Sequence, residues 1–420
     1  MRPVIFHIDV NSAFLSWEAV HRLKNLGGTV DLREIASAVG GDMAKRRGIV
    51  LAKSPLAKKC GVYTSQTIVE ALRCCPELTI VPPNYNLYRK CSQAFLEILR
   101  QYSPCVEQYS IDEAFVDMTG TTRLFGTPRE AAERIREHIF QELGFTVNIG
   151  VSVNRVLAKM ASDFEKPNRV HTLFPEELEE KLWPLPLRNL FFVGRATEKK
   201  LISLGFRTIG DIARADTELL RTHLKKHGEV VQAFARGQDV SLVHSEPGTN
   251  KGYGNSTTIA FDVTDSSTAK LVLLGLAETV GTRLREAQVQ AEVISLGIKT
   301  SDLHHTSRQI TLDNPTNITG ELHQVACQLF DELWDGQPIR HLGIQTGKLH
   351  QEQEGRQLEL FDKFDYERQE KLDAAVDKIR SRYGIDAVKR AAFLASTIDH
   401  LSGGISREKR TVDYTKIPVE

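Results

Sequence analysis

The sequence predicts an α+β protein with several domains. Its 420 residues exceed what one ordinary hydrophobic core holds, so two to four domains are expected. A hydrophobic content of 41% and a charged content of 26% are typical of globular proteins. Short β-branched and aromatic runs alternate with longer runs of helical apolar spacing, which predicts sheets covered by helices.

The amino-terminal segment predicts a buried strand that ends in a carboxylate. Residues 3–8 are mostly apolar, and Asp9 follows them. A helix is expected over residues 13–26, with Ser12 as its N-cap and the glycine pair at 27–28 as its end.

A second acidic site lies within residues 107–117, where Asp112 and Glu113 interrupt strand-forming residues. An isolated pair of this kind is most often a solvated turn. Asp9 changes the interpretation, because three carboxylates at neighbouring strand ends can converge on a divalent cation. Such a cation relieves their mutual repulsion, and oxygen-only ligands suit Mg²⁺. The sequence therefore predicts a metal site suited to two-metal phosphoryl transfer.

Residues 6–14 (Phe-His-Ile-Asp-Val-Asn-Ser-Ala-Phe) and 109–115 (Tyr-Ser-Ile-Asp-Glu-Ala-Phe) resemble the two acidic motifs of Y-family translesion DNA polymerases, in the DinB/UmuC group. The resemblance implies a polymerase right hand. Its palm would be an antiparallel sheet backed by helices, with small fingers, a helical thumb and an α/β little finger. The expected domains are the palm (1–13 and 84–173), fingers (14–83), thumb with a helix-hairpin-helix-like turn (174–244), little finger (250–350) and tail (351–420).

The resemblance also implies an activity. The chain is expected to be a template-directed DNA polymerase of low fidelity that copies past damaged bases during DNA repair. The expected catalytic residues are Asp9, Asp112 and Glu113, and two Mg²⁺ ions would be held by these three together with Val10. The expected partners are primer–template DNA, dNTP and the sliding clamp, and the protein is expected to act as a monomer.

The incoming nucleotide is expected to meet residues of the first motif and two lysines. The implied contacts are Asn11, Ser12, Ala13, Phe14, Lys58 and Lys166. Phe14 would be the steric gate that excludes a 2′-hydroxyl, although a single Phe is more often a core residue. Lys58 is expected on a short helix that Ser54 caps and Pro55 begins. Lys53, Lys58 and Lys59 make this helix start a candidate phosphate site, with a solvated basic helix as the alternative. Many family members carry Tyr and Arg where this chain has Pro55 and Lys58.

Lys166 precedes Pro167 in a segment close to the family's third motif. We expect Pro167 to end the helix, so that Lys166 is fixed at the helix end and contacts the triphosphate. The alternative is a cation that only answers the helix macrodipole.

DNA contacts are expected from the thumb and the little finger. Gly194 is expected to take a positive φ in a thumb hairpin whose following amides face a phosphate, although Phe192 replaces one glycine of the usual motif. An ordinary helical hairpin is the alternative. In the little finger, a β-α-β-β-α-β order is expected, and Lys299, Arg308 and Arg340 are the candidate contacts to the DNA backbone.

The tail carries a short motif after a polar run. Gln357, Leu358, Leu360 and Phe361 resemble the peptide by which bacterial polymerases bind the sliding clamp, and packing onto the little finger is the alternative. A helix is expected to follow, with an apolar stripe made by Leu372, Val376, Ile379 and Tyr383.

Composition excludes several classes of protein. Lys+Arg and Asp+Glu both number 54, so a DNA-binding surface must be local. Six cysteines without a Cys-x-x-Cys pair argue for a reducing compartment and against structural zinc. With no signal peptide and no membrane-spanning run, a cytoplasmic protein is expected. Two other functions stay open: a clamp-binding adaptor with little activity, and a nucleotide cyclase that shares the palm.

Overall fold

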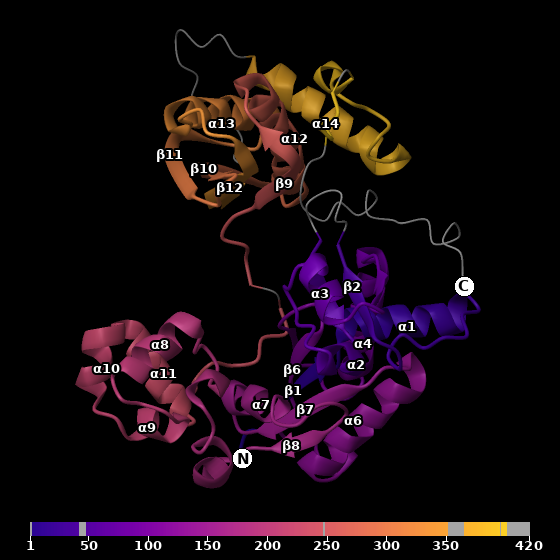
Figure 1. Ribbon diagram of the computed structural model, residues 1–420, viewed down its shortest axis with the longest axis vertical. Helices are drawn as coiled ribbons and strands as arrows, with labels where there is room; N and C mark the ends of the chain where they lie inside the picture. Colours follow the sequence, from indigo (N-terminus) through magenta and orange to yellow (C-terminus); the bar gives the residue numbers. More distant parts are fainter. Residues whose placement is uncertain (1, 42–47, 247, 352–364, 395, 401–420) are drawn as a thin grey trace.

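The computed structural model describes residues 2–41, 48–246, 248–351, 365–394 and 396–400 (Figure 1). Its first sheet has five strands in the order β5-β6-β1-β7-β8. We call this sheet, with the helices packed on it, the palm. The strands are β1 (Ile5–Val10), β5 (Val106–Gln108), β6 (Glu113–Asp117), β7 (Val147–Ser152) and β8 (Val170–Thr172). The helices are α1 (Ala13–Asn25), α4 (Tyr85–Arg100), α5 (Thr122–Phe125), α6 (Pro128–Leu143) and α7 (Arg155–Ser162).

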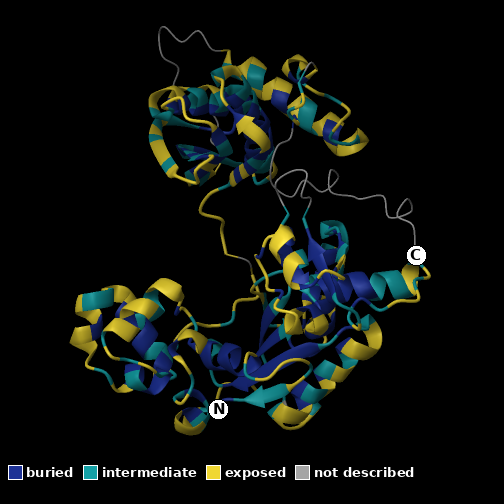
Figure 2. Ribbon diagram, viewed as in Figure 1, coloured by how far each residue is buried: buried dark blue, intermediate teal, exposed yellow. Residues whose placement is uncertain are grey.

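The central strands of the palm are buried on both faces (Figure 2). Phe6 and Ile8 of β1 point into a core shared with α1, α4 and α6. The opposite face of the sheet receives α7, which packs against β7 and β1. A Cβ on Gly150 of β7 would lie 1.9 Å from the carbonyl oxygen of Ala158 on α7, so only glycine permits this close approach.

The helix α1 belongs to the palm core, since Leu15, Trp17 and Ala19 lie in the same buried cluster as β1. The expected boundary between residues 13 and 14 therefore does not follow the packing. Ser12 occupies the N-cap position of α1, but its φ of 47° is left-handed and its side chain makes no capping hydrogen bond. The N-cap position predicted for Ser12 is thus confirmed, but its side chain does not cap the helix, because this backbone turns it into the pocket described below.

A small unit that we call the fingers is inserted between α1 and α4. It contains a three-stranded sheet in the order β3-β2-β4, in which β2 pairs antiparallel with β3 and parallel with β4. Ser54 caps α2 by accepting a hydrogen bond from the amide of Ala57, as the sequence predicted. The elements are β2 (Ser37–Gly40), β3 (Val50–Lys53), α2 (Pro55–Lys59), α3 (Ile68–Cys74) and β4 (Thr79–Val81).

A helical unit, which we call the thumb, follows the palm. Short helical turns at Pro175–Glu177, Leu178–Leu182 and Leu187–Asn189 lead into four helices. These are α8 (Arg195–Ser203), α9 (Ile209–Arg214), α10 (Thr217–Leu224) and α11 (Lys226–Ala235). The thumb core continues onto α7, because Val156, Leu157 and Met160 belong to the same buried cluster as Leu201 and Ile212.

An extended segment connects the thumb to the last unit, the little finger (Figure 1). The little finger has the predicted β-α-β-β-α-β order and a sheet in the order β11-β10-β12-β9, with its helices α12 and α13 over one shared core. The elements are β9 (Gly254–Val263), α12 (Ser266–Glu286), β10 (Val289–Thr300), β11 (His305–Thr316), α13 (Thr319–Leu333) and β12 (Ile339–Gln351). None of the described helices is long and apolar enough to cross a membrane.

The tail helix α14 (Tyr366–Tyr383) is followed by a short turn at Ala391–Phe393. The predicted apolar stripe does not face the protein: Leu372, Ile379 and Tyr383 are exposed. The buried residues of α14 are Asp373 and Arg380 instead. The reason is that the facing helix α12 presents charged partners, so α14 attaches through ion pairs.

Candidate active site

Strand pairing brings the carboxylates together at one end of the palm sheet. Antiparallel β1 and β6 place Asp9 directly opposite Glu113. The amide of Val10 donates a hydrogen bond to the carbonyl of Asp112 at 3.0 Å, which holds the turn before β6 against β1. The sequence alternation that buries Phe6 and Ile8 on one face turns Asp9 to the other. The two acidic motifs therefore converge as the sequence predicted.

Two lysines face these carboxylates. Lys166 Nζ lies 2.7 Å from Asp9 Oδ2, and Lys159 Nζ lies 2.7 Å from Glu113 Oε1. Burial raises the pKa of Asp9 to about 6, although Lys166 opposes the shift, and the negative charges of Glu113 and Asp163 add to it. The negative charges of Asp9 and Glu113 thus lie close together, and a cation beside them stabilises both. The oxygen donors of the site fit a hard divalent cation such as Mg²⁺.

Asp112 is oriented by the residue two positions before it. Ser110 Oγ donates to Asp112 Oδ1 at 2.7 Å and accepts from the Asp112 amide at 3.3 Å. This Ser-x-Asp turn directs the Asp112 carboxylate into a pocket between the palm and the fingers.

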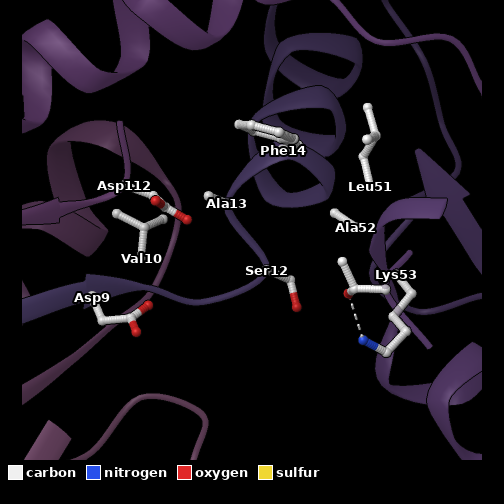
Figure 3. A pocket seen from close by; sticks show the side chains of 10 residues that line it. Asp9, Val10, Ser12, Ala13, Phe14, Leu51, Ala52, Lys53 and Asp112 are labelled. Atoms are coloured by element: carbon white, nitrogen blue, oxygen red, sulfur yellow. Dashed lines mark hydrogen bonds between the residues drawn. The ribbon is translucent and has the colours of Figure 1, made fainter. Parts of the chain in front are cut away.

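The pocket has a volume of about 240 Å³ (Figure 3). Asp9 and Asp112 lie at one end and Lys53 lies at the other, with Phe14 and Ser12 between them. The residues that line it are Asp9, Val10, Ser12, Ala13, Phe14, Leu51, Ala52, Lys53, Thr64 and Asp112. One end is therefore anionic and the other cationic, as a nucleotide triphosphate with its cation would require.

The ring of Phe14 is held in a fixed orientation. It stacks on Tyr88 of α4 with a centroid distance of 4.5 Å and an interplanar angle of 7°. Tyr88 in turn donates a hydrogen bond to the buried Glu18 at 2.9 Å. Phe14 is half-buried and lines the pocket, so it serves the palm core and the pocket wall at once.

Lys53 and Thr64 also line the pocket, and the sequence indicated Lys53 only as one of three lysines around a candidate phosphate site. Lys53 Nζ donates to Thr64 Oγ1 at 3.1 Å. Burial lowers the pKa of Lys53, and the nearby Lys58 lowers it further. Lys58 itself is exposed on α2 and does not line the pocket. The basic flank before Ser54 was the available signal for Lys53, whereas nothing in the sequence indicated Thr64.

Asn11 turns away from the pocket. Its side chain donates to Asn148 at 3.2 Å and accepts from Thr146 Oγ1 at 3.0 Å and from the amide of Asn168 at 2.9 Å. These bonds tie the end of β1 to β7 and to the loop after α7. A side-chain contact from Asn11 to a nucleotide thus stays a prediction that this geometry does not favour.

The predicted helix end at Lys166 is wrong, because α7 ends at Ser162. The Asn148 side chain donates to the carbonyls of Ser162 and Glu165 at 3.1 and 2.7 Å, and so takes the place of helical amides. Lys166 consequently lies beyond the helix, in a loop, where it pairs with Asp9 and with Asp163. The ion pair with Asp163, three residues earlier in the chain, has a distance of 2.8 Å.

The thumb hairpin differs from its prediction in one backbone angle. Gly194 has a φ of −84° and occupies the N-cap position of α8, whereas Phe192 takes the positive φ of 69°. A left-handed residue with a large side chain costs about 1–2 kcal/mol. Stacking of Phe192 on Phe191 and Phe234, with centroid distances of 4.4 and 5.6 Å, offsets this strain. The phosphate contact at Gly194 stays a prediction.

The little finger does not bring its three candidate cations onto one face. Lys299 pairs in register with His305 and His341 on the face that the helices leave open. Arg308 lies opposite the buried Leu296 and contacts Glu332 of α13 at 3.2 Å, so it sits on the helix-covered side. Arg340 falls at a register shift of β12. The clamp-motif residues Gln357, Leu358, Leu360 and Phe361 lie outside the described residues.

Comparison with protein families covers most of the chain. The impB/mucB/samB family matches residues 8–163, the IMS family HHH motif matches residues 175–206, and the impB/mucB/samB family C-terminal domain matches residues 250–360. The matched segments contain the two acidic motifs, the thumb hairpin and the little-finger sheet.

Two curated relatives match nearly the whole chain. A protein from Clostridium acetobutylicum, called DNA polymerase IV, is 41% identical over 394 residues, which cover 94% of this chain and 99% of the relative. A DNA polymerase IV from Alkaliphilus oremlandii is 36% identical over 404 residues, which cover 94% of this chain and all of the relative.

A solved structure shares the fold. It is titled Y-family DNA polymerase chimera Dbh-Dpo4(243-245)-Dbh, and it covers 83% of this chain and 99% of its own at 21% identity and a TM-score of 0.72. The α+β multidomain architecture is therefore confirmed. Together with the relatives, it establishes that the chain belongs to the DNA polymerase IV group of the Y-family polymerases and is a DNA-directed DNA polymerase.

Proposed function

We propose that the enzyme performs translesion synthesis, transferring a nucleotide from dNTP to a primer 3′-hydroxyl at the pocket between palm and fingers. The observation that carries this proposal is the convergence of Asp9, Asp112 and Phe14 on one pocket that has Lys53 at its far end. The small side chains of Ser12, Ala13 and Ala52 leave room along its wall. A pocket wall of small side chains supports the acceptance of damaged bases, because it imposes little steric selection on the base pair.

We propose that Asp9, Asp112 and Glu113, with Val10 beside them, hold two Mg²⁺ ions. When bound, Mg²⁺ stabilises charge on the transferred phosphoryl group and lowers the pKa of the 3′-hydroxyl. Ser110 orients Asp112, and Lys159 orients Glu113. Lys166 can exchange the Asp9 carboxylate for a triphosphate oxygen, which is also an anionic acceptor. Lys53, Lys58 and the amides of Ser12 and Ala13 are the other candidate partners of the triphosphate.

Phe14 would exclude ribonucleotides as the steric gate. Its stacked and half-buried ring supports this role, because a ring that cannot rotate away blocks a 2′-hydroxyl. The DNA backbone would be contacted by Gly194 in the thumb and by Lys299 on the open face of the little finger. Arg308 and Arg340 are weaker candidates, given the placement described above.

Primer extension tests the proposal. Asp112→Asn should lower extension by at least about 100-fold, because the charge that the reaction centre needs is removed. DNA binding, measured by fluorescence anisotropy, should stay within about twofold, since the phosphate contacts lie elsewhere. The matched control is Asp117→Asn, which changes a carboxylate at the opposite end of β6, where Asp117 caps the amide of Thr119. Near wild-type extension by Asp112→Asn would contradict the metal assignment, whereas absence of extension by the unchanged protein would favour the adaptor function.

The clamp interaction rests on residues 357–361 alone. We propose that a segment containing Gln357, Leu358, Leu360 and Phe361 docks in extended form on a sliding clamp, and that the enzyme otherwise acts as a monomer. Leu360→Ala combined with Phe361→Ala should leave insertion on a free primer unchanged and remove stimulation by loaded clamp. Equal stimulation of both proteins would count against the proposal.

A further inference from the structure

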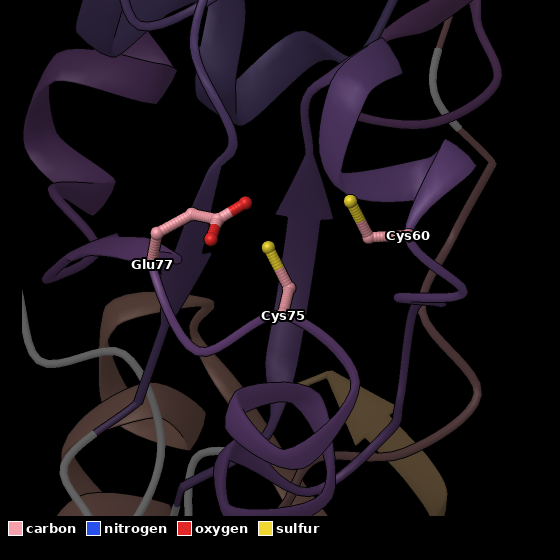
Figure 4. A group of neighbouring side chains, drawn as sticks. All are labelled: Cys60, Cys75 and Glu77. Atoms are coloured by element: carbon pink, nitrogen blue, oxygen red, sulfur yellow. The ribbon is translucent and has the colours of Figure 1, made fainter.

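The fingers contain a group of three side chains that the polymerase reaction does not use. Cys60 lies at the end of α2, Cys75 and Glu77 lie in the turn between α3 and β4, and the three side chains point toward one another (Figure 4). Their sulfur and oxygen atoms all lie within 4.8 Å of one another. Cys75 is buried, whereas Cys60 and Glu77 are exposed, so the group sits at the surface and can be reached from solvent.

Backbone structure fixes the direction of all three side chains. Cys60 is the C-cap of α2, where its amide donates to the carbonyls of Leu56 and Lys58. Cys75 is the C-cap of α3, where its amide donates to the carbonyl of Ala71. Glu77 lies in the turn to β4, which the bond from the Leu78 amide to the Cys75 carbonyl closes at 3.1 Å. The three donors are therefore pre-positioned by ordered elements.

We propose that Cys60, Cys75 and Glu77 form a binding site for zinc, a thiophilic divalent cation. A tetrahedral zinc ion with Zn–S bonds of about 2.3 Å needs ligand atoms roughly 3.5–3.8 Å apart. The 4.8 Å limit requires only small rotations of the two exposed side chains to reach this spacing. Two thiolates and one carboxylate are a set that favours zinc over magnesium, and three protein ligands leave the fourth position to water.

The chemistry of the group suits a bound cation. Two thiolates and a carboxylate within 4.8 Å of one another would repel each other if no cation lay between them. A zinc ion would displace the thiol protons and pair with all three groups. A Cys60–Cys75 disulfide would instead leave Glu77 without a role in the cluster.

The position of the site gives it a structural consequence. Cys60 ends the helix that begins directly after Lys53, and Cys75 and Leu78 belong to the fingers core together with Ala57 and Val62. A cation at this point would join the end of α2 to the α3–β4 turn. It would therefore stiffen the part of the fingers that carries the pocket wall from Leu51 to Lys53.

Cobalt(II) titration of the reduced, metal-free, full-length protein tests the site. We expect one equivalent of Co²⁺ to produce a thiolate-to-cobalt charge-transfer band and tetrahedral d–d bands, and Zn²⁺ to displace it. The thiolate band reports only on sulfur ligands, so cobalt bound at the carboxylates of the active site cannot produce it. Zinc should also raise the Tm of the protein.

Four variants decide the outcome. Cys60→Ser, at an exposed position that tolerates the change, should abolish the charge-transfer band, and Cys75→Ser should do the same. Glu77→Gln should weaken Co²⁺ affinity by about tenfold or more. The matched control Cys91→Ser, in α4 of the palm, should bind as the unchanged protein does. Absence of the band in the unchanged protein, its persistence in Cys60→Ser, or isolation of a Cys60–Cys75 disulfide without metal would each overturn the proposal.

Discussion

Two buried glutamates show how differently one side chain can be accommodated. Glu18 of α1 is fully buried in the palm, and Glu278 of α12 is 3% exposed in the little finger. Glu278 accepts from Arg380 on one oxygen and from Arg390 on the other. Glu18 accepts from the Tyr88 hydroxyl on Oε1, and its Oε2 has no hydrogen-bond partner among the described residues. Glu278 is thus held between two cations, whereas the partner of Glu18 is neutral.

The charges around Glu278 form a network that attaches α14. Asp373 of α14 accepts from the Thr319 amide at 2.7 Å and from Arg285 at 3.2 Å, and Arg285 also contacts Asp377 at 2.6 Å. Every buried carboxylate in this interface meets at least one arginine. Burial of charges in pairs therefore builds an interface, whereas burial of a carboxylate beside a neutral partner leaves a group whose protonation is easily changed.

The largest expected effect comes from breaking the network. Arg380→Ala leaves Glu278 buried with one cation fewer, so the packing of α14 on α12 should lose about 3–5 kcal/mol. Hydrogen exchange of the α14 amides in the full-length protein measures this loss as a lower opening free energy. The control is Lys371→Ala on the same helix. Its ion pair with Glu367 is exposed, and its loss should leave the opening free energy of α14 nearly unchanged. An equal loss of opening free energy in the two variants would show that the buried arginine pairs do not hold α14 in place.

The second prediction concerns pH and Glu18. Burial raises the pKa of Glu18 to about 7, against the lowering effects of Tyr88 and Arg22. The folded protein therefore binds more protons than the unfolded chain between about pH 4.5 and 7. The contribution of Glu18 to stability thus falls as pH rises through this window, by about 3 kcal/mol in all.

Glu18→Gln should remove that dependence. Relative to the unchanged protein, the variant should gain about 3 kcal/mol between pH 4.5 and 7.5. Opening free energies of the α1 amides, from hydrogen exchange corrected for intrinsic rates, provide the measurement. Glu97→Gln, an exposed position on the adjacent α4, is the control and should change little. A parallel pH dependence in Glu18→Gln and the unchanged protein would show that Glu18 stays ionised.

The smallest expected effect comes from Tyr88→Phe, which removes the hydroxyl and keeps the ring. Tyr88→Phe removes the hydrogen bond to Glu18 at a cost of about 1 kcal/mol and keeps the stack on Phe14. The ratio of dNTP to rNTP incorporation should therefore stay unchanged in Tyr88→Phe and fall in Phe14→Ala. If Tyr88→Phe lowers the ratio as strongly as Phe14→Ala does, the hydroxyl and not the stacked ring positions the gate.

The sequence predicted the elements whose signals are local. Ser54 caps α2 and Pro55 begins it, and the little finger has the expected β-α-β-β-α-β order. The carboxylates of the site could be predicted as well, because each lies at a strand end inside a recognisable motif.

The features that the sequence did not predict depend on contacts between distant elements. Asn148 of β7 ends α7 early through its hydrogen bond to the Ser162 carbonyl. Glu278 and Arg285 of α12 bind charged residues of α14, so the charged face of α14 is buried and its apolar stripe is exposed. The thiols of Cys60 and Cys75 meet only because two helix ends fold together, so their sequence spacing resembles no metal motif. In each case the deciding group lies far away in the chain or on another element.

The extended segment before the little finger limits the distance between the little finger and the palm. Its first part is fastened to the palm: the Leu242 carbonyl accepts from Arg155 at 3.1 Å, and the His244 amide donates to Glu107 at 2.9 Å. Only residues 245–253 remain before β9, and their fully extended length is at most about 30–32 Å. This tether begins beside α7 and β5, so its length limits how far the little finger can lie from the palm sheet.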